Sequence, residues 1–292
     1  MNSPSHANFV LIDGVLRPDA IAPLYQRGEP LEIEPLYLGT RWEALHDLGP
    51  ILVTVRGPSS LISETCQHAL QQADACLLYS RASMKTVADH LRRFMAPPDV
   101  LGGNGLLRFA DPLVARYWLG SYAGVHLDAI LGPIDAWHAV ENPHAWDGAA
   151  RGEWRSVVRA DAPPEWVEAW AHLGEAQLSA LDRAARWRFM ERLYGSFQHS
   201  HPEHLAHIDN SQLTQWFDDR LDEAQAWGLA SERGLAIWVE YSLRWGAGFT
   251  AHADGPYQHW LARTPQALEL APELRIQQMD NDCLNVEILK EV

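Results

Sequence analysis

Short apolar runs and amphipathic repeats alternate along the first half of the chain. Apolar runs at residues 9–12, 50–55 and 75–79 predict strands. The run at 50–55 predicts a central strand, because it is β-branched, continuous and bounded by turn residues. Repeats with helical spacing at residues 60–73 and 83–95 predict helices. This alternation favours an α/β lobe with a mixed, largely parallel sheet flanked by helices.

The segment at residues 106–119 predicts a strand that runs directly into a helix. Its apolar run at 106–109 supplies the strand. Asp111 can cap the helix, and Pro112 then takes the first helical position, where its missing N–H costs nothing. Arg108 places a charge inside this strand. We interpret Arg108 and Asp111 as an internal ion pair, because a buried charge needs a partner. A pair that contacts a binding partner is the alternative.

The second half of the chain follows a helical pattern. Amphipathic repeats at residues 175–197, 209–227 and 232–245 predict helices. The last of these is apolar nearly all round, which is typical of a helix that is fully buried or shared with a partner. We therefore predict two domains, an α/β domain at residues 1–160 and an all-helical lobe at residues 161–292.

Charge and composition narrow the classes of function. The net charge is −15 and the Lys and Arg residues are dispersed, which disfavours nucleic-acid binding and suits a basic or mixed protein partner. No apolar run approaches the ~18 residues of a membrane span, and the N-terminus carries no basic-then-apolar signal. Three cysteines without metal-binding spacing suit a reducing compartment. We expect a cytoplasmic protein that binds neither nucleic acid nor membrane.

Histidines form the strongest candidate for metal chemistry. The run at residues 199–207 holds four of them and is followed by Asp209. His204 and His207 would lie one turn apart on a helix, and His is a common zinc ligand. The pattern is not HExxH, and the run lies at a polar helix junction, so a solvated loop and helix start is the favoured interpretation. We expect no metal, no cofactor and no catalytic residue.

Aromatic side chains of the helical lobe are the candidate contacts for a partner. Trp and Tyr are favoured interface anchors, although most of them pack in cores. We expect one or two of these side chains to be exposed in a groove of the helical lobe. We expect this lobe, or its cleft with the α/β lobe, to take a protein cargo. The candidates are Trp216, Phe217, Trp238, Tyr241 and Trp245.

Short motifs in the first 133 residues resemble those of a known family, in the family's order. They are FVLIDG at 9–14, LYLGT at 36–40, LGPILV at 48–53, HLR at 90–92, LRFADP at 107–112 and GP at 132–133. The chain is similar in these motifs to the type VI secretion adaptors, also called effector chaperones (Tap or TEC proteins). Their N-terminal conserved domain was long labelled as of unknown function, and a helical C-terminal region follows it.

The resemblance implies an adaptor rather than an enzyme. Such proteins bind a specific toxic effector in the cytoplasm and help load it onto the VgrG-type spike. The motif residues that it brings out are expected to be structural, and they are Asp13, Gly14, Gly39, Thr40, Gly49, Pro50, Arg108, Phe109, Asp111, Pro112, Gly132 and Pro133. Two alternatives stay open at this point. One is an α/β hydrolase that uses the histidine cluster at 199–207, and the other is an immunity-type inhibitor that binds a toxin.

Overall fold

A computed structural model describes residues 4, 6–148 and 151–290 of the chain. The chain divides into two compact units. The sheet unit comprises Met1–Pro143 and Ala149–Trp187, and the helical unit comprises His144–Gly148 and Arg188–Val292. The division therefore falls within a helix rather than after residue 160, where the sequence placed it.

The helix that contains the division is α6 (Glu175–Ser200). Its first half belongs to the sheet unit because Leu178 and Leu181 pack against the core of that unit. Its second half belongs to the helical unit, where Phe189 and Leu193 are buried. The Pro-rich break in the sequence thus precedes the division by about two dozen residues, because apolar contacts and not composition define the compact units.

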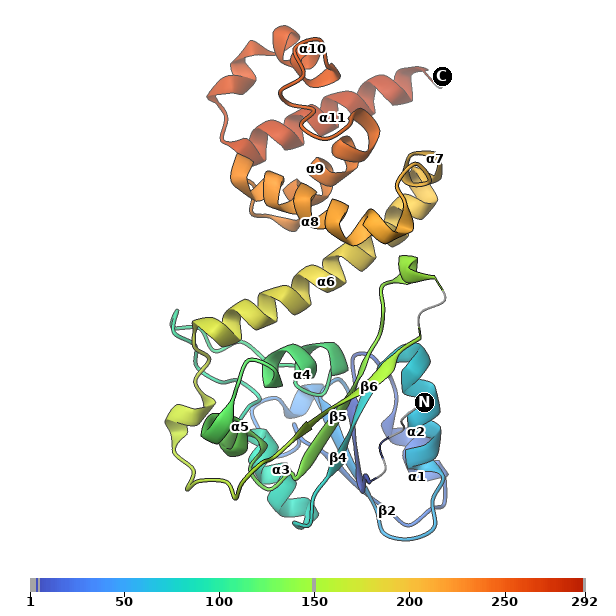
Figure 1. Ribbon diagram of the computed structural model, residues 1–292, viewed down its shortest axis with the longest axis vertical. Coiled ribbons are helices and arrows are strands. Elements are labelled where there is room, and N and C mark those ends of the chain that lie inside the picture. Colours follow the sequence, from blue (N-terminus) through green and yellow to red (C-terminus); the bar gives the residue numbers. More distant parts are fainter. Residues whose placement is uncertain (1–3, 5, 149–150, 291–292) are drawn as a thin grey trace. The chain divides into compact units, whose positions relative to one another are not determined.

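One antiparallel sheet forms the centre of the sheet unit, with strand order β2-β3-β1-β4-β5-β6 (Figure 1). The strands are β1 (Phe9–Asp13), β2 (Leu31–Pro35), β3 (Pro50–Val55), β4 (Ala75–Tyr79), β5 (Ala136–Glu141) and β6 (Glu153–Val158). In the register, Leu11 of β1 lies opposite Leu52 of β3 on one side and Cys76 of β4 on the other.

Helices cover both faces of this sheet (Figure 1). One face carries α1 (Ile21–Gln26) and α2 (Leu61–Gln72), and the other carries α3 (Met84–Arg92), α4 (Pro112–Leu119) and α5 (Gly124–Leu131). Side chains alternate along β1 accordingly. Val10 and Ile12 join the core with α1 and α2, whereas Phe9 and Leu11 join the core with α3, α4 and α5.

The predicted largely parallel sheet is wrong, because all the strand pairs among the described residues are antiparallel. Continuous apolar strands are typical of parallel sheets because helices cover both of their faces. Here two helical layers cover an antiparallel sheet, and its strands are continuous apolar runs for the same reason. The β3–α2–β4 connection does join two strands of the same direction, but β1 lies between them and pairs antiparallel with both.

The predicted strand at residues 106–109 is also absent. These residues form an irregular segment in which Leu106 is exposed and the Leu107 N–H donates to the Met95 carbonyl. The helix that follows is as predicted. The Asp111 carboxylate accepts the Leu113 N–H at 3.1 Å, and Pro112 occupies the first helical position of α4.

The C-terminal part is helical, as the sequence predicts. After α6 come α7 (Pro202–Leu205), α8 (Asn210–Trp227), α9 (Glu232–Trp245), α10 (Pro256–Arg263) and α11 (Pro272–Lys290). Short 3-10 turns complete the chain: η1 (Glu43–Leu45), η2 (Ala145–Asp147), η3 (Glu168–Ala171) and η4 (Pro265–Glu269). Helix α9 is central, since it packs against α7, α8 and α11. Among the described helices, none combines the length and the apolar character that crossing a membrane requires.

A piece of the β5–β6 connection is built into the helical unit. Its residue Trp146 is 1 % exposed and belongs to the helical core. The indole Nε1–H donates to Thr214 Oγ1 at 3.0 Å, and the ring lies 5.0 Å from Tyr194 and 5.4 Å from Phe217 between centroids. His144 stacks on the indole at 4.1 Å. The helical unit is therefore assembled from two separate stretches of chain.

Replacing Trp146 tests this assembly. We expect Trp146→Ala to lower the free energy of unfolding by about 3–5 kcal/mol, because it leaves a large cavity in the helical core. Trp146→Phe keeps an aromatic ring and loses the bond to Thr214, so it should cost about 1–2 kcal/mol. Urea unfolding of both variants measures the difference. An alanine variant within 1 kcal/mol of the wild type would show that the segment is not part of this core.

Candidate functional site

The guanidinium of Arg108 binds the carboxylate of Asp13 at the end of β1. Nη2 donates to Oδ1 at 2.9 Å and Nε donates to Oδ2 at 3.3 Å. The predicted partner, Asp111, lies farther away, with its Oδ2 3.5 Å from the same Nη2. Asp13 also accepts the N–H groups of Val15 and Leu16. Two motifs that lie 95 residues apart are thus joined, and Asp111 is the secondary partner.

Burial controls the charge state of this pair. Asp13 is almost completely buried, and desolvation raises the pKa of its carboxyl above the ordinary value, while Arg108 acts to lower it. The pKa of the nearby Tyr37 is also raised, first by burial and then by the charge of Asp13. Arg108 is therefore what stabilises the ionised form of Asp13.

A second bidentate pair lies at the same end of the sheet. Arg17 donates from Nε and Nη2 to the carboxylate of Asp74, at 2.8 Å each. Asp74 is 1 % exposed, and its backbone carbonyl accepts the N–H of Asp13 at 3.1 Å. Arg17 and Asp74 are not among the residues predicted from the sequence. The sequence signal that could have found them is an acidic residue beside the end of each buried strand. A carboxylate buried there needs a cation as its partner.

Two motif glycines bring the neighbouring turns together. The Gly14 N–H donates to the Gly49 carbonyl at 3.1 Å, and a Cβ at Gly14 would overlap the backbone of residues 47–49. A Cβ at Gly49 would lie 2.5 Å from the Tyr37 ring. Pro50 follows as the first residue of β3, opposite Asp13. These positions require glycine because there is no space for a side chain.

Gly39 and Thr40 shape the turn after β2. Gly39 has a φ of +71°, and its N–H donates to Glu43 Oε2 at 3.2 Å. The Thr40 hydroxyl donates to the Tyr37 carbonyl at 2.7 Å and accepts the Trp42 N–H at 3.1 Å. The Thr40 hydroxyl therefore stabilises the turn by hydrogen bonds to the backbone before and after it.

His90 and Gly132 form another contact between distant motifs. Gly132 has a φ of +54°, and a Cβ there would overlap the imidazole of His90. The His90 Nε2–H donates to the Ile130 carbonyl at 2.8 Å. Burial lowers the pKa of His90 to about 4, so the ring is neutral near pH 7. Next in the chain, Pro133 offers its carbonyl to the Ser80 hydroxyl at 2.6 Å.

Phe109 lies in the core beneath these contacts. It is fully buried, with ring centroids 6.4 Å from Trp118 and 6.5 Å from Trp137. The motif residues of the sheet unit thus hold distant parts of the chain together, and the structure gives each one a packing or hydrogen-bonding role.

Residues 8–129 match the family model described as "Domain of unknown function (DUF4123)".

The DUF4123 match begins at β1 and ends within α5, so it covers most of the sheet and the helices on both of its faces. DUF4123 is associated with adaptors that load effectors in type VI secretion. No curated protein and no solved structure matches the chain. The helical unit lies outside the DUF4123 match.

The five candidate aromatic residues of the helical unit fall into two groups. Phe217, Trp238 and Tyr241 are buried in the helical core, which leaves them no surface for a partner. Trp216 and Trp245 are half-buried at the edge of that core and keep part of their rings accessible. The role of these residues in partner binding stays a prediction, and only Trp216 and Trp245 have surface for it.

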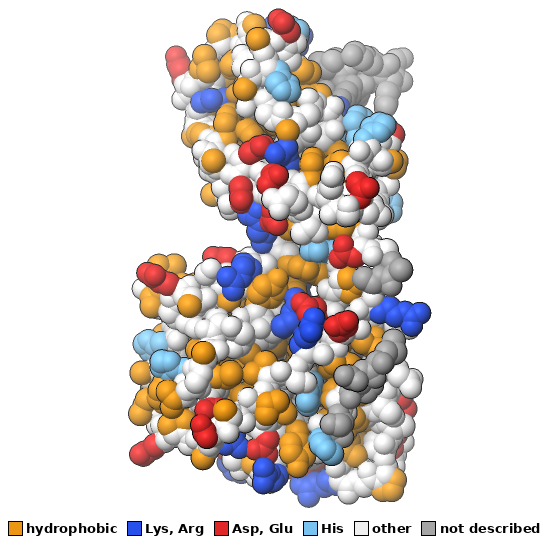
Figure 2. All heavy atoms as spheres, viewed as in Figure 1, with side chains coloured by type: hydrophobic (Ala, Val, Ile, Leu, Met, Phe, Trp, Pro, Cys, Tyr) orange, Lys and Arg blue, Asp and Glu red, His pale blue; other side chains and the backbone are white. Residues whose placement is uncertain are grey.

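Two candidate nucleophile and acid–base groups of the sheet unit are built into the core. Cys76 is completely buried, burial raises the pKa of its thiol, and the thiol lies 3.6 Å from the Ala110 carbonyl. His90 is held under Gly132, while the adjacent Asp89 pairs with Lys85 at the surface. Neither the Cys76 thiol nor the His90 ring is exposed at the surface. Figure 2 shows acidic and basic side chains interspersed on the face that it presents, rather than gathered into a basic patch.

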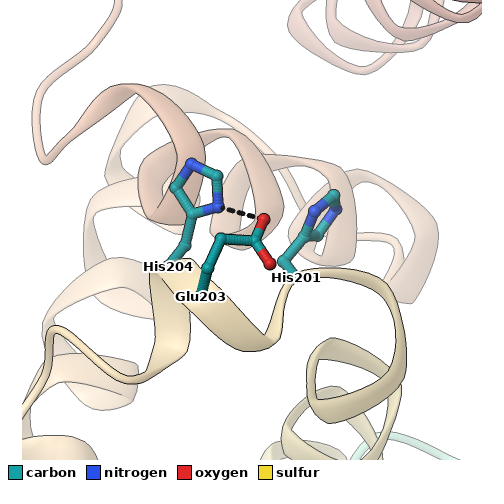
Figure 3. A group of neighbouring side chains, drawn as sticks. All are labelled: His201, Glu203 and His204. Atoms are coloured by element: carbon teal, nitrogen blue, oxygen red, sulfur yellow. Dashed lines mark hydrogen bonds and ion pairs between the residues drawn. The ribbon is translucent and has the colours of Figure 1, made fainter.

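The structure brings together three residues of the histidine-rich run. The side chains of His201, Glu203 and His204 place their ligand atoms within 4.8 Å of one another (Figure 3). His199 lies outside this group, and its Nδ1–H donates to the Gly195 carbonyl at 2.7 Å. The sequence had paired His204 with His207. The turn into α7 instead pairs His204 with His201.

Removing Arg108 should destabilise the fold. We expect Arg108→Ala to lower the free energy of unfolding by about 3 kcal/mol, at the low end for a broken buried pair because Arg108 is 33 % exposed. Arg81→Ala is the matched control, because its guanidinium is 82 % exposed beside Asp135, and it should cost less than about 1 kcal/mol. Urea unfolding at pH 7 measures both.

The loss caused by Arg108→Ala should shrink as the pH falls. Without Arg108 the pKa of Asp13, already raised by burial, rises further, so acid protonates the carboxyl and removes the uncompensated charge. The difference in unfolding free energy between wild type and variant should therefore decrease from pH 7 towards pH 4. A loss that stays constant over this range would contradict the assigned partner.

Gly132 offers a test of the second motif contact. Gly132→Ala combines a positive φ with overlap of the His90 ring, and we expect it to cost more than about 2 kcal/mol. Gly102→Ala is the control, since Gly102 has a φ of +82° and nothing within 4 Å of its Cβ position, so backbone strain alone should cost about 1 kcal/mol. Thermal and urea unfolding compare the two variants. Equal losses would rule out the packing role.

Proposed function

We propose that the protein is a non-catalytic cytoplasmic adaptor that binds a type VI secretion effector and helps load it onto the VgrG-type spike. The DUF4123 match over residues 8–129 carries this proposal. The contacts of the sheet unit support it. Arg108, Asp13 and His90 hold the fold together, and the buried Cys76 and His90 are not presented to a substrate.

The helical unit is the part that we assign to effector binding. It lies outside the DUF4123 match, so it is free to differ between adaptors of different cargo. Trp216 on α8 and Trp245 at the end of α9 are half-buried aromatic residues, the type that most often anchors an interface. Asp219 lies one turn from Trp216 on α8 and is exposed.

The negative charge of α8 indicates which kind of effector segment would bind beside Trp216. The chain carries a net charge of −15, and α8 bears Asp218, Asp219, Asp222 and Glu223, of which Glu223 pairs with Arg220 of the same helix. A basic effector segment with an apolar side chain would fit Trp216 beside Asp219, because opposite charges steer the encounter and the indole supplies the buried contact.

Binding of purified effector to full-length variants tests the proposal. Wild-type protein should bind the effector encoded beside it and should also co-purify with the spike protein. Trp216→Ala and Trp245→Ala should each weaken effector binding about tenfold, which corresponds to about 1.4 kcal/mol. Urea unfolding checks that each variant is still folded, because both rings pack against the helical core. Calorimetric titration measures the Kd.

Tyr25→Ala is the matched control. Tyr25 is 68 % exposed on α1 of the sheet unit, so its removal should leave effector binding unchanged. Equal losses in all three variants would refute the assignment to the helical unit. A protein that blocks the toxic activity of the effector and does not contact the spike would instead be an immunity protein, and the adaptor proposal would be wrong.

A further inference from the structure

The three side chains of Figure 3 provide nitrogen and oxygen donors on one short stretch of chain. His201 is the residue before α7, and Glu203 and His204 lie within α7. Glu203 Oε1 and His204 Nδ1 are 3.0 Å apart. Two ligands of a tetrahedral zinc ion, with bonds of about 2.0–2.1 Å, lie about 3.3 Å apart. This pair therefore already has nearly the spacing of a chelate.

The third donor is oriented by a carboxylate on another helix. His201 Nε2 lies 3.1 Å from Oε1 of Glu240 on α9. An ionised carboxylate only accepts hydrogen bonds, so Nε2 carries the proton and Nδ1 keeps its lone pair. Metal-bound histidines commonly donate their second ring N–H to a carboxylate in this way. Arg244 in turn lies 3.4 Å from the same oxygen of Glu240 and fixes its position.

The donor set selects a class of ion. Two imidazoles and one carboxylate suit Zn²⁺, Ni²⁺ or Cu²⁺, whereas Mg²⁺ and Ca²⁺ prefer oxygen ligands alone. Side-chain exposures of 17 % for His201, 38 % for His204 and 66 % for Glu203 make the group accessible from solvent. Three protein ligands leave a fourth position for water.

We propose that His201, Glu203 and His204 form a zinc site on the helical unit, with water as the fourth ligand. On binding, the zinc ion replaces the hydrogen bond between Glu203 and His204. The proton on His204 Nδ1 passes to water, and the ring takes its other neutral tautomer with the proton on Nε2. Glu240 holds His201 in the tautomer that binds. The site is independent of the proposed adaptor role.

Zinc titration of the untagged full-length protein tests this site. After dialysis against a chelator, wild-type protein should take up one zinc ion per chain with a Kd in the micromolar range, measured by calorimetry and by metal analysis. His201→Ala and His204→Ala should each weaken binding by about 100-fold, and Glu203→Gln by about tenfold. Zinc should raise the melting temperature of the wild type and not that of His204→Ala.

His199→Ala and His207→Ala are the matched controls. Both histidines come from the same run and lie outside the group of three, so their removal should leave zinc binding within about twofold of the wild type. The proposal is overturned by a wild type that takes up no zinc. It is overturned equally if the control variants lose as much affinity as His204→Ala, because binding would then be a property of the whole histidine-rich run.

Discussion

The pair between Arg108 and Asp13 is the constraint on which the sheet unit depends. Asp13 ends β1, the strand that pairs with both β3 and β4, and its carboxylate is buried where an unpaired charge is costly. The cation is Arg108, which lies in the segment that leads into α4, 95 residues after Asp13 in the chain. One ion pair thus connects the centre of the sheet to the helical layer on one face. A neighbouring pair, Arg17 with Asp74, joins the turn after β1 to the residue before β4.

This arrangement explains why short motifs scattered over the first 133 residues occur together. Each motif supplies one half of a contact: Gly14 lies against Gly49, and Gly132 against His90. A change in one half leaves the other without space or without a partner, so the contacts restrict both. These motif residues therefore serve the packing and hydrogen bonding of the sheet unit itself. The half-buried Trp216 and Trp245 and the group of His201, Glu203 and His204 lie in the helical unit, outside the DUF4123 match.

Several local features of the structure could be predicted from sequence, whereas strand direction and the partners of distant ion pairs could not. The strand at residues 50–55 and the cap at Asp111 depend on neighbouring residues alone, and both are found. Strand direction depends on which strand lies between β3 and β4, and buried strands look alike whether they are parallel or antiparallel. Asp111 was the nearest carboxylate to Arg108 in sequence, but Asp13 is nearer in space. The pairing of His201 with His204 followed from the turn into α7, for which the sequence had no periodic signal.

The position of Trp146 has a consequence for how such proteins diversify. A chimera that exchanges only the residues after 187 would transplant a helical unit without the indole that fills its core. A complete exchange of the helical unit between related chains therefore has to include both the tip of the β5–β6 connection and the C-terminal helices. A single crossover supplies both only if it lies before residue 144, and it then also transfers β6 and the first half of α6. Because Trp146 and Thr214 are in contact across 68 residues of sequence, changes at the tip and changes in the helices are expected to occur together.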